Sequence, residues 1–128
     1  MKICITAEGD SLDSQVDSRF GRCRYFLIYD TEKNAAEWLL NSNAGFSGGA
    51  GTQSAQLMAS KGVEVVLTGN IGPNAFKILE AAGIRVVTGL FGKVSEIIEE
   101  FRTGVMKPAQ EATVQSKFGA PKSGEKKR

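Results

Sequence analysis

Short apolar runs alternate with glycine-rich turns along most of this chain. Alternating or continuous apolar stretches predict strands at residues 2–7, 22–29, 35–40, 63–68 and 84–88. Helical spacing predicts one helix that Thr52 caps and Gly62 ends, one that begins at Pro73 and ends at Gly83, and one over 94–101. The last two strands and the helix between them form a complete β-α-β unit. These patterns predict an α/β protein.

The connections between the elements predict how the sheet is ordered. A short turn at 30–34 makes the second and third strands antiparallel, and right-handed crossovers make the later pairs parallel. The simplest five-stranded mixed sheet has the order 3-2-1-4-5, with strand two antiparallel and the helices packed on its faces. The other four strands then end at one edge of the sheet. Four segments are predicted to meet there: 8–22, 43–52, 69–73 and 89–93.

Charge divides the chain into two parts. Of the 16 Lys/Arg and 14 Asp/Glu in 128 residues, six Lys/Arg but only two Asp/Glu lie in 107–128. We therefore expect a single, slightly acidic domain at 1–106 and a basic, mostly disordered tail at 107–128. A solvated end is favoured for this tail over a binding arm, and the domain shows no nucleic-acid footprint. No apolar run suits a membrane and the start does not resemble a secretory signal, so the expected location is the cytoplasm.

Several classes of enzyme are excluded by the residues that are missing. The chain has no histidine, which removes Ser-His and Cys-His nucleophile systems and any zinc site with histidine. The acidic residues show no paired spacing for acid-base catalysis. The first strand, KICITA, lacks the carboxylates that a magnesium-dependent nuclease needs. These absences remove histidine-dependent nucleophile and zinc chemistry, paired-carboxylate acid-base catalysis and a magnesium-dependent nuclease.

Two glycine-rich turns are candidates for binding an anion through main-chain amides. In the first, Gly48, Gly49 and Gly51 precede Thr52, and a backbone without Cβ atoms can turn its N–H groups inward. A merely flexible loop is an equal alternative. The stretch lacks the GK[ST] of a P-loop and matches only part of the dinucleotide fingerprint.

The second turn, Thr68 to Asn74, offers Asn70, Gly72 and Asn74. The two asparagine amides are suited to orienting a ligand beside the start of a helix. Helix capping with tight packing is the alternative explanation for the same residues.

Side chains near the same edge supply charge and sulfur. Arg19 and Arg22 are candidates to offset a negative ligand, although pairing with Asp10, Asp13 or Asp17 is an alternative. Cys23 is a candidate metal ligand as a thiolate, and a buried apolar role is at least as well supported. Cys4 lies in the middle of a strand and is expected in the core.

The chain resembles the dinitrogenase iron-molybdenum cofactor biosynthesis family, which includes NifX-like carriers, the C-terminal domain of NifB and the orange proteins. The resemblance covers roughly residues 1–104. It rests on Ser18–Arg22 with Tyr25–Phe26, Gly49–Thr52, Gly62–Val63, Thr68–Phe76 and Ala82–Ile84.

This resemblance implies a ribonuclease H-like fold and non-catalytic binding or carriage of a metal-sulfide cluster, containing molybdenum with iron or copper. It implies donor or acceptor proteins for that cluster as partners. Relatives often carry a histidine in the glycine-rich loop, and residues 44–51 have none. The alternative function is a protein-interaction or regulatory module without bound metal. The sequence does not indicate an oligomeric state.

Overall fold

The computed structural model describes residues 1–42, 49–104, 106, 108–109 and 112–113. Its elements, in chain order, are β1 (Lys2–Ala7), β2 (Tyr25–Asp30), β3 (Ala35–Leu40), α1 (Ala50–Ser60), β4 (Val65–Leu67), α2 (Pro73–Ala81), β5 (Arg85–Val87) and α3 (Val94–Arg102). The longest described helix has 11 residues. None of the described helices has the length and apolar character that a membrane crossing requires.

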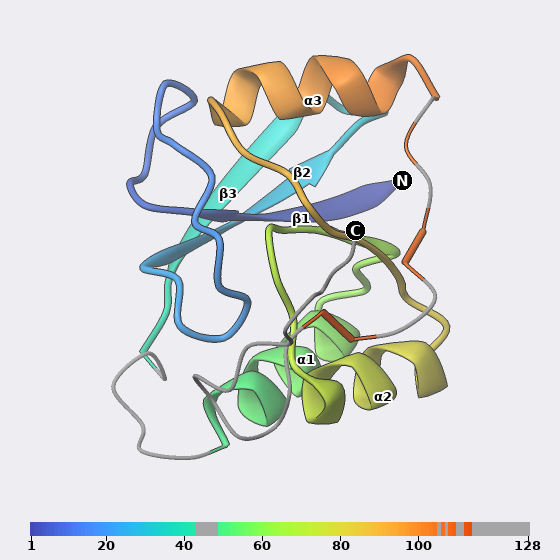
Figure 1. Ribbon diagram of the computed structural model, residues 1–128. Coiled ribbons are helices and arrows are strands. Elements are labelled where there is room, and N and C mark those ends of the chain that lie inside the picture. Colours follow the sequence, from blue (N-terminus) through green and yellow to red (C-terminus); the bar gives the residue numbers. More distant parts are fainter. Residues whose placement is uncertain (43–48, 105, 107, 110–111, 114–128) are drawn as a thin grey trace, which may run out of the picture.

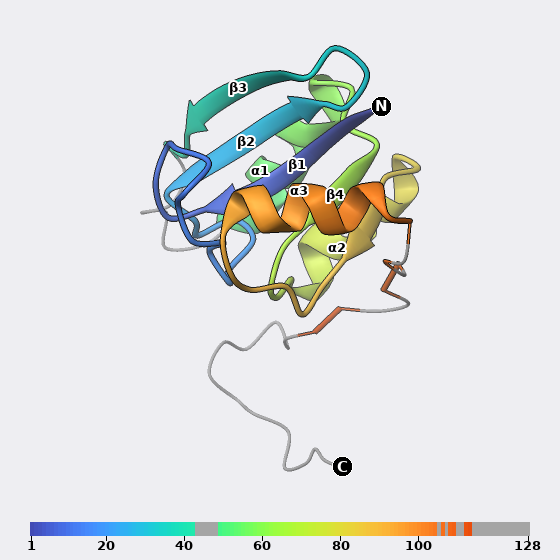
Figure 2. The same ribbon diagram turned by 90° about the horizontal axis from the view of Figure 1, so that it is seen from above.

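The five strands form one mixed sheet in the order β3-β2-β1-β4-β5, which confirms the predicted order. β2 is antiparallel to both of its neighbours, whereas β1, β4 and β5 are parallel to one another. Helices α1 and α2 cover one face of the sheet and α3 covers the other (Figures 1 and 2). Each helix begins at its left-hand end in Figure 1, and β1 runs toward that same side. The ribonuclease H-like likeness stays a prediction.

Two apolar cores follow from the alternation of side chains across the sheet. Ile3 and Ile5 of β1 belong to the core on the α3 side, together with Ile97. Cys4, between them, belongs to the core on the side of α1 and α2, together with Met58. β2 alternates in the same way. Its run of consecutive apolar residues is therefore explained by burial on both faces, as the sequence indicates.

The second strand begins later than predicted, at Tyr25 instead of residue 22. The side-chain amide of Asn41, just after β3, donates to the carbonyl oxygens of Gly21 at 2.9 Å and Cys23 at 2.8 Å. The amide N–H of Asn41 donates to Arg24 O at 2.9 Å. The backbone of Asn41 therefore continues the β2-β3 pairing by one hydrogen bond, and its side chain satisfies the carbonyl groups that would otherwise extend the ladder further.

The first helix begins earlier than predicted, so Thr52 is not its cap. The helix starts at Ala50, and its N-cap is Gly49 with φ at 79°. A left-handed conformation is inexpensive for glycine, which allows the helix to start directly after it. Thr52 is thus the third residue of α1, inside its first turn.

The chain continues to contact the domain beyond the predicted boundary at residue 106. Ala109 donates its N–H to Val86 O at 2.6 Å, and Thr113 donates its N–H to Ile71 O at 2.9 Å. Of the predicted tail, residues 107, 110–111 and 114–128 lie outside the described part of the chain.

Candidate functional site

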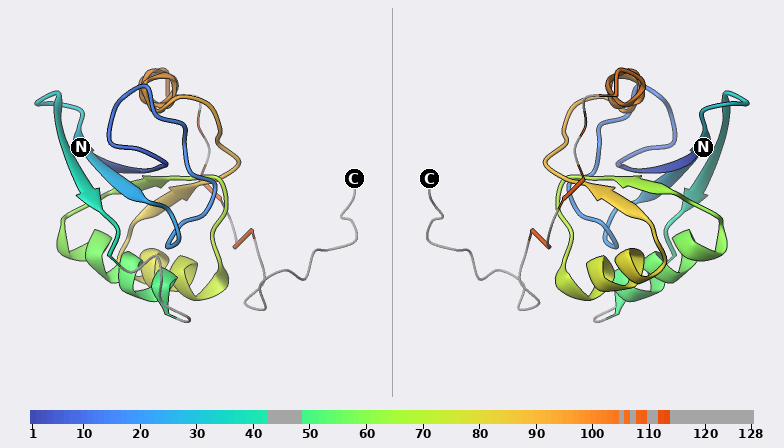
Figure 3. Two further views of the ribbon diagram at one scale, coloured as in Figure 1. Left: turned by 90° about the vertical axis from the view of Figure 1, so that its left-hand side faces the viewer. Right: turned by 90° about the vertical axis from the view of Figure 1, so that its right-hand side faces the viewer.

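Four segments meet at the carboxyl end of the parallel strands, and Figure 3 (left) looks onto them. We call this edge the rim and define it by residues 8–22, 49–52, 69–73 and 89–93. Gly48 and its neighbours 43–47, which were also predicted here, lie outside the described residues. Described residues from each of the four predicted segments therefore lie at the rim.

Backbone hydrogen bonds tie the rim segments together. The N–H of Phe20 donates to Asn70 O at 3.0 Å, and the N–H of Asn70 donates to Ser18 O at 2.6 Å. Val16 donates to Gly92 O at 2.8 Å on the other side of the rim. The predicted convergence is thus a set of direct main-chain contacts.

Glycine allows two of these segments to approach each other very closely. A Cβ placed on Gly21 would lie 2.7 Å from Gly51 Cα, and a Cβ on Gly51 would lie 3.3 Å from Ala75 Cβ. Gly51 belongs to the first turn of α1 and Ala75 to the first turn of α2. The starts of α1 and α2 are therefore held against each other and against the loop that carries the rim arginines.

Among the described residues, no side chain caps the start of α1 or α2, and we call these two helix starts open, whereas the start of α3 is closed. α1 and α2 have glycine N-caps, Gly49 and Gly72, with no side-chain cap and no acidic residue in the first turn. In α3, by contrast, Glu96 Oε1 accepts a hydrogen bond from the N–H of Lys93 at 3.2 Å. The first N–H groups of a helix have no acceptor within it, and its N-terminus carries a partial positive charge. Two adjacent open starts are suited to an anion.

Both rim arginines are exposed, and Arg19 pairs with Asp17. Arg19 Nε lies 3.4 Å from Asp17 Oδ1, and the Arg19 side chain is 57% exposed while that of Asp17 is 7% exposed. The main-chain N–H of Arg19 also donates to Asp17 Oδ1 at 3.1 Å. The pairing that the sequence left open is therefore present for Arg19. Arg22 is exposed, three residues further along the rim.

The two asparagines of the second turn are exposed beside the start of α2. The backbone N–H and carbonyl of Asn70 form hydrogen bonds with the 18–20 segment. The side chain of Asn70 takes no part in these backbone hydrogen bonds. Asn74 is the second residue of α2, after Pro73. Pro73 is the first helical residue, as predicted.

Cys23 lies in the core on the α1 and α2 side and is fully buried, as is Cys4. Burial, assisted by the negative charge of Asp17, raises the pKa of the Cys23 thiol to about 12. Burial also raises the pKa of Cys4 well above its usual value. Both thiols are therefore protonated near neutral pH, which agrees with the buried apolar alternative for Cys23. No group of three or more His, Cys, Asp or Glu that could hold a metal ion occurs among the described residues.

Sequence reasoning missed several polar side chains under the rim. Thr6 Oγ1 lies 2.8 Å from Thr68 Oγ1 and donates to Asp17 O at 2.6 Å. Thr6 is the next-to-last residue of β1 and Thr68 directly follows β4, and a threonine near the end of each strand was the available signal. Ser54, in α1, has a buried hydroxyl without a hydrogen-bond partner in the described chain. It lies four residues after Ala50, about 6 Å along the helix axis.

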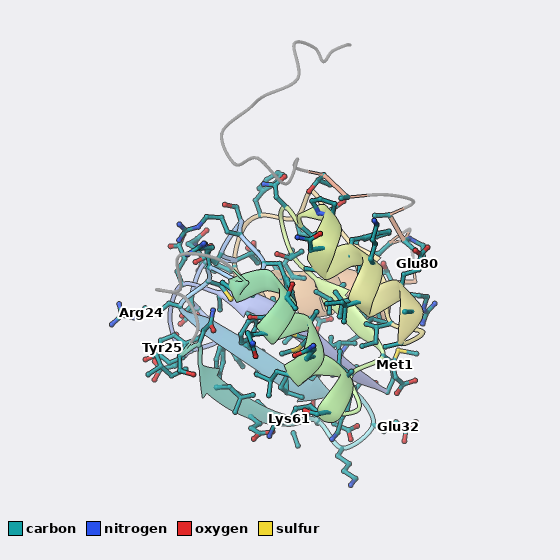
Figure 4. The ribbon with its side chains drawn as sticks, turned by 90° about the horizontal axis from the view of Figure 1, so that it is seen from below. Met1, Arg24, Tyr25, Glu32, Lys61 and Glu80 are labelled. Atoms are coloured by element: carbon teal, nitrogen blue, oxygen red, sulfur yellow. The ribbon has the colours of Figure 1, made fainter. Side chains whose placement is uncertain are left out.

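The end of the sheet opposite the rim carries a shallow hollow. Figure 4 shows Arg24 and Tyr25 at the rim end and Met1 and Glu32 far from them. The Arg24 guanidinium carbon lies 5.9 Å from the centroid of the Tyr25 ring, a cation-π distance. A shallow hollow at the far end is lined by charged and small residues from β1, β2 and β3 and the turn between them: Lys2, Ile28, Asp30, Lys33, Ala35, Ala36 and Glu37.

Comparison with known proteins identifies relatives that cover nearly the whole domain. Residues 1–104 match the protein family described as dinitrogenase iron-molybdenum cofactor. The fold is similar to the apo form of the orange protein from Desulfovibrio gigas, with a TM-score of 0.85, 40% identity, and coverage of 88% of this chain and 96% of that one.

Two further relatives agree with this match. A putative NifB protein from Thermotoga has a TM-score of 0.77 and 38% identity, with coverage of 88% of this chain and 97% of that one. An uncharacterised protein from Methanocaldococcus jannaschii is 32% identical over 107 residues, which are 81% of this chain and 87% of its own.

Proposed function

Because this chain belongs to the dinitrogenase iron-molybdenum cofactor family, we propose that its rim binds and carries an anionic metal-sulfide cluster. The cluster is cargo, contains molybdenum with iron or copper, and is held without being chemically converted. Proteins that donate or accept such clusters are the partners that this role requires. The cytoplasm is the proposed location.

One observation carries this proposal: the two open helix starts meet at the contact of Gly21, Gly51 and Ala75. Sulfide ligands at the surface of a cluster accept hydrogen bonds, and main-chain N–H groups supply them without adding a charge that must be desolvated. Each helix N-terminus contributes about 0.3–1 kcal/mol toward an anion, and up to about 2 kcal/mol in a partly buried geometry. Because two helix N-termini meet here, both contribute to the affinity for the anion.

Side chains of the rim complete the proposed site. Arg22 and the partly exposed Arg19 offset the charge of the cluster, and Asn70 and Asn74 orient it from the α2 side. The main-chain contributors are the amides around the helix starts: Gly49, Gly51, Thr52 and Gly72. Gly48, which the sequence also suggested, lies outside the described residues. Cys23 is not included, because a buried thiol with a pKa near 12 is a poor source of thiolate.

The proposal predicts that the protein takes up a molybdenum sulfide anion. Anaerobically purified protein is expected to contain metal or to become coloured when mixed with tetrathiomolybdate and copper. Metal analysis and the absorption spectrum after gel filtration measure this. A protein that remains metal-free and colourless at saturating tetrathiomolybdate, with and without copper, would contradict the proposal and favour the interaction module.

A further inference from the structure

The two edges of the sheet differ in how they are covered. Beside β5, the N–H of Ala109 donates to Val86 O at 2.6 Å, so a neighbouring segment protects part of this edge. β3 is the outermost strand on the other side of the sheet (Figure 2), and none of the described residues pairs with its outer side. Within the described part of the chain, the outer edge of β3 is therefore open to a further strand.

The register between β2 and β3 determines which backbone groups of β3 point outward. Asn41 donates its N–H to Arg24 O at 2.9 Å, and these two residues continue the β2-β3 register by one position. Hydrogen-bonded and non-hydrogen-bonded pairs alternate along an antiparallel ladder. The backbone groups of the odd-numbered residues of β3 therefore face β2. The backbone groups of Ala36, Trp38 and Leu40 face away from the sheet.

The side chains of this edge do little to prevent pairing. Edge strands are commonly protected by lysine, proline or a bulge, and β3 has none of these. The single charge of the strand, on Glu37, is paired with Lys61 Nζ at 3.2 Å. Leu40 is 65% exposed, and Trp38 is only partly buried against the core on the α3 side. The edge therefore combines outward-facing backbone groups with exposed apolar surface.

We propose that the outer edge of β3 pairs with the same edge of a second copy of this chain, in an antiparallel register centred on Trp38. A two-fold axis at this position sets Trp38 opposite Trp38, and Ala36 opposite Leu40 of the second copy. The outward-facing backbone groups of all three residues then form about six hydrogen bonds. The large, exposed side chain of Leu40 lies against the small side chain of Ala36 on the same face of the sheet.

Charge and size favour this register over the neighbouring ones. A pair centred on Glu37 would set two carboxylates directly opposite each other, which destabilises a sheet. A pair centred on Leu39 would set Trp38 opposite Leu40 and leave Ala36 facing a residue beyond the end of β3. In the register centred on Trp38, Glu37 faces Leu39 of the second copy and no like charges are directly opposed. The edge of β3 is thus complementary to itself, which is why a second copy is the proposed occupant.

Pairing through β3 leaves the rim of each copy accessible. β3 runs parallel to β1, because both strands are antiparallel to β2. An antiparallel pair of β3 strands therefore turns the two rims toward opposite ends of the combined sheet. The inference goes beyond the proposed function and does not depend on it.

Sedimentation equilibrium of the full chain between about 10 µM and 1 mM tests the pairing. The average mass is expected to rise toward twice that of one chain, because a single pair of strand edges makes a small interface of moderate affinity. Leu40→Lys puts a charge on the edge and is expected to weaken the association at least about tenfold. Leu12→Lys puts the same charge on a leucine that is 45% exposed at the rim, and it is expected to associate like the unmodified chain.

Amide hydrogen exchange locates the contact. The amides of Ala36, Trp38 and Leu40 are expected to exchange slowly at high protein concentration and fast after dilution. A chain that stays monomeric over the whole range would overturn the proposal, as would a dimer in which these amides exchange equally fast at both concentrations. Slow exchange of the same amides in a monomer would show that the chain covers its own edge, and would overturn it too.

Discussion

Gly21→Ala is expected to lower the free energy of unfolding by about 4 kcal/mol. Gly21 has φ at 94°, a conformation that costs other residues about 1–2 kcal/mol. Its new Cβ would lie 2.7 Å from Gly51 Cα and 2.9 Å from Gly51 N. Because both atoms belong to the backbone, relief requires α1 to move, at a cost of about 1–3 kcal/mol. Urea unfolding measures the loss.

Gly62→Ala is the matched control for this substitution. Gly62 has φ at 75°, and a Cβ placed there meets nothing within 4 Å. Its cost is therefore the conformational part alone, about 1–2 kcal/mol. If the two substitutions lowered the free energy of unfolding equally, Gly21 and Gly51 would not be in contact. The claim that the starts of α1 and α2 are held against this loop would then be wrong.

Thr52→Glu is expected to change stability and binding in opposite directions. Thr52 is the third residue of α1, the position from which a glutamate folds back onto the open N–H groups of a helix. Glu96 occupies the same position in α3 and makes this contact. The new carboxylate is expected to stabilise the protein by about 0.5–1 kcal/mol. It would also occupy the anion site and repel the cargo, weakening tetrathiomolybdate binding by at least about tenfold, or about 1.4 kcal/mol.

Two controls separate charge from size and position in this experiment. Thr52→Gln places a neutral side chain of the same length at the same position and is expected to bind far better than Thr52→Glu. Gln56→Glu adds the same charge one turn later, on an exposed position of α1. If Thr52→Glu bound tetrathiomolybdate as tightly as the unmodified chain, the start of α1 would not be part of the site.

The fold was predictable because its signals are local. The apolar runs of β1 and β2, Pro73 at the start of α2 and the glycines after the helices each act within a few residues. Connection length and handedness then leave one simple sheet order. The convergence of the rim segments follows from that order alone, since parallel strands end at the same edge.

The start of β2 differs from its prediction because it depends on contacts between distant residues, whereas the earlier start of α1 follows from the local conformation of Gly49. The start of β2 is displaced because Asn41, at the end of β3, satisfies the carbonyl groups of Gly21 and Cys23. The contact of Thr113 with Ile71 joins positions 42 residues apart. No local propensity reports such pairings, because they exist only after the sheet has formed.

The candidate site was predictable in its location but not in its detail. Glycines and arginines at the ends of parallel strands indicated the rim. The pairing of Arg19 with buried Asp17 and the burial of Cys23 depend on how the 8–22 segment folds onto the sheet. The 8–22 segment forms hydrogen bonds with the end of β1 and with Asn70 in the turn after β4, so the directions of its side chains follow from tertiary packing.

The central claim is that the open starts of α1 and α2 together bind a molybdenum sulfide anion. Titration of ¹⁵N-labelled protein with tetrathiomolybdate tests it most directly. The account predicts the largest amide shifts at Gly51 and Thr52 on one helix and at Gly72 and Asn74 on the other. Shifts confined to the far hollow around Lys2 and Asp30, or no shift at saturating anion, would contradict it.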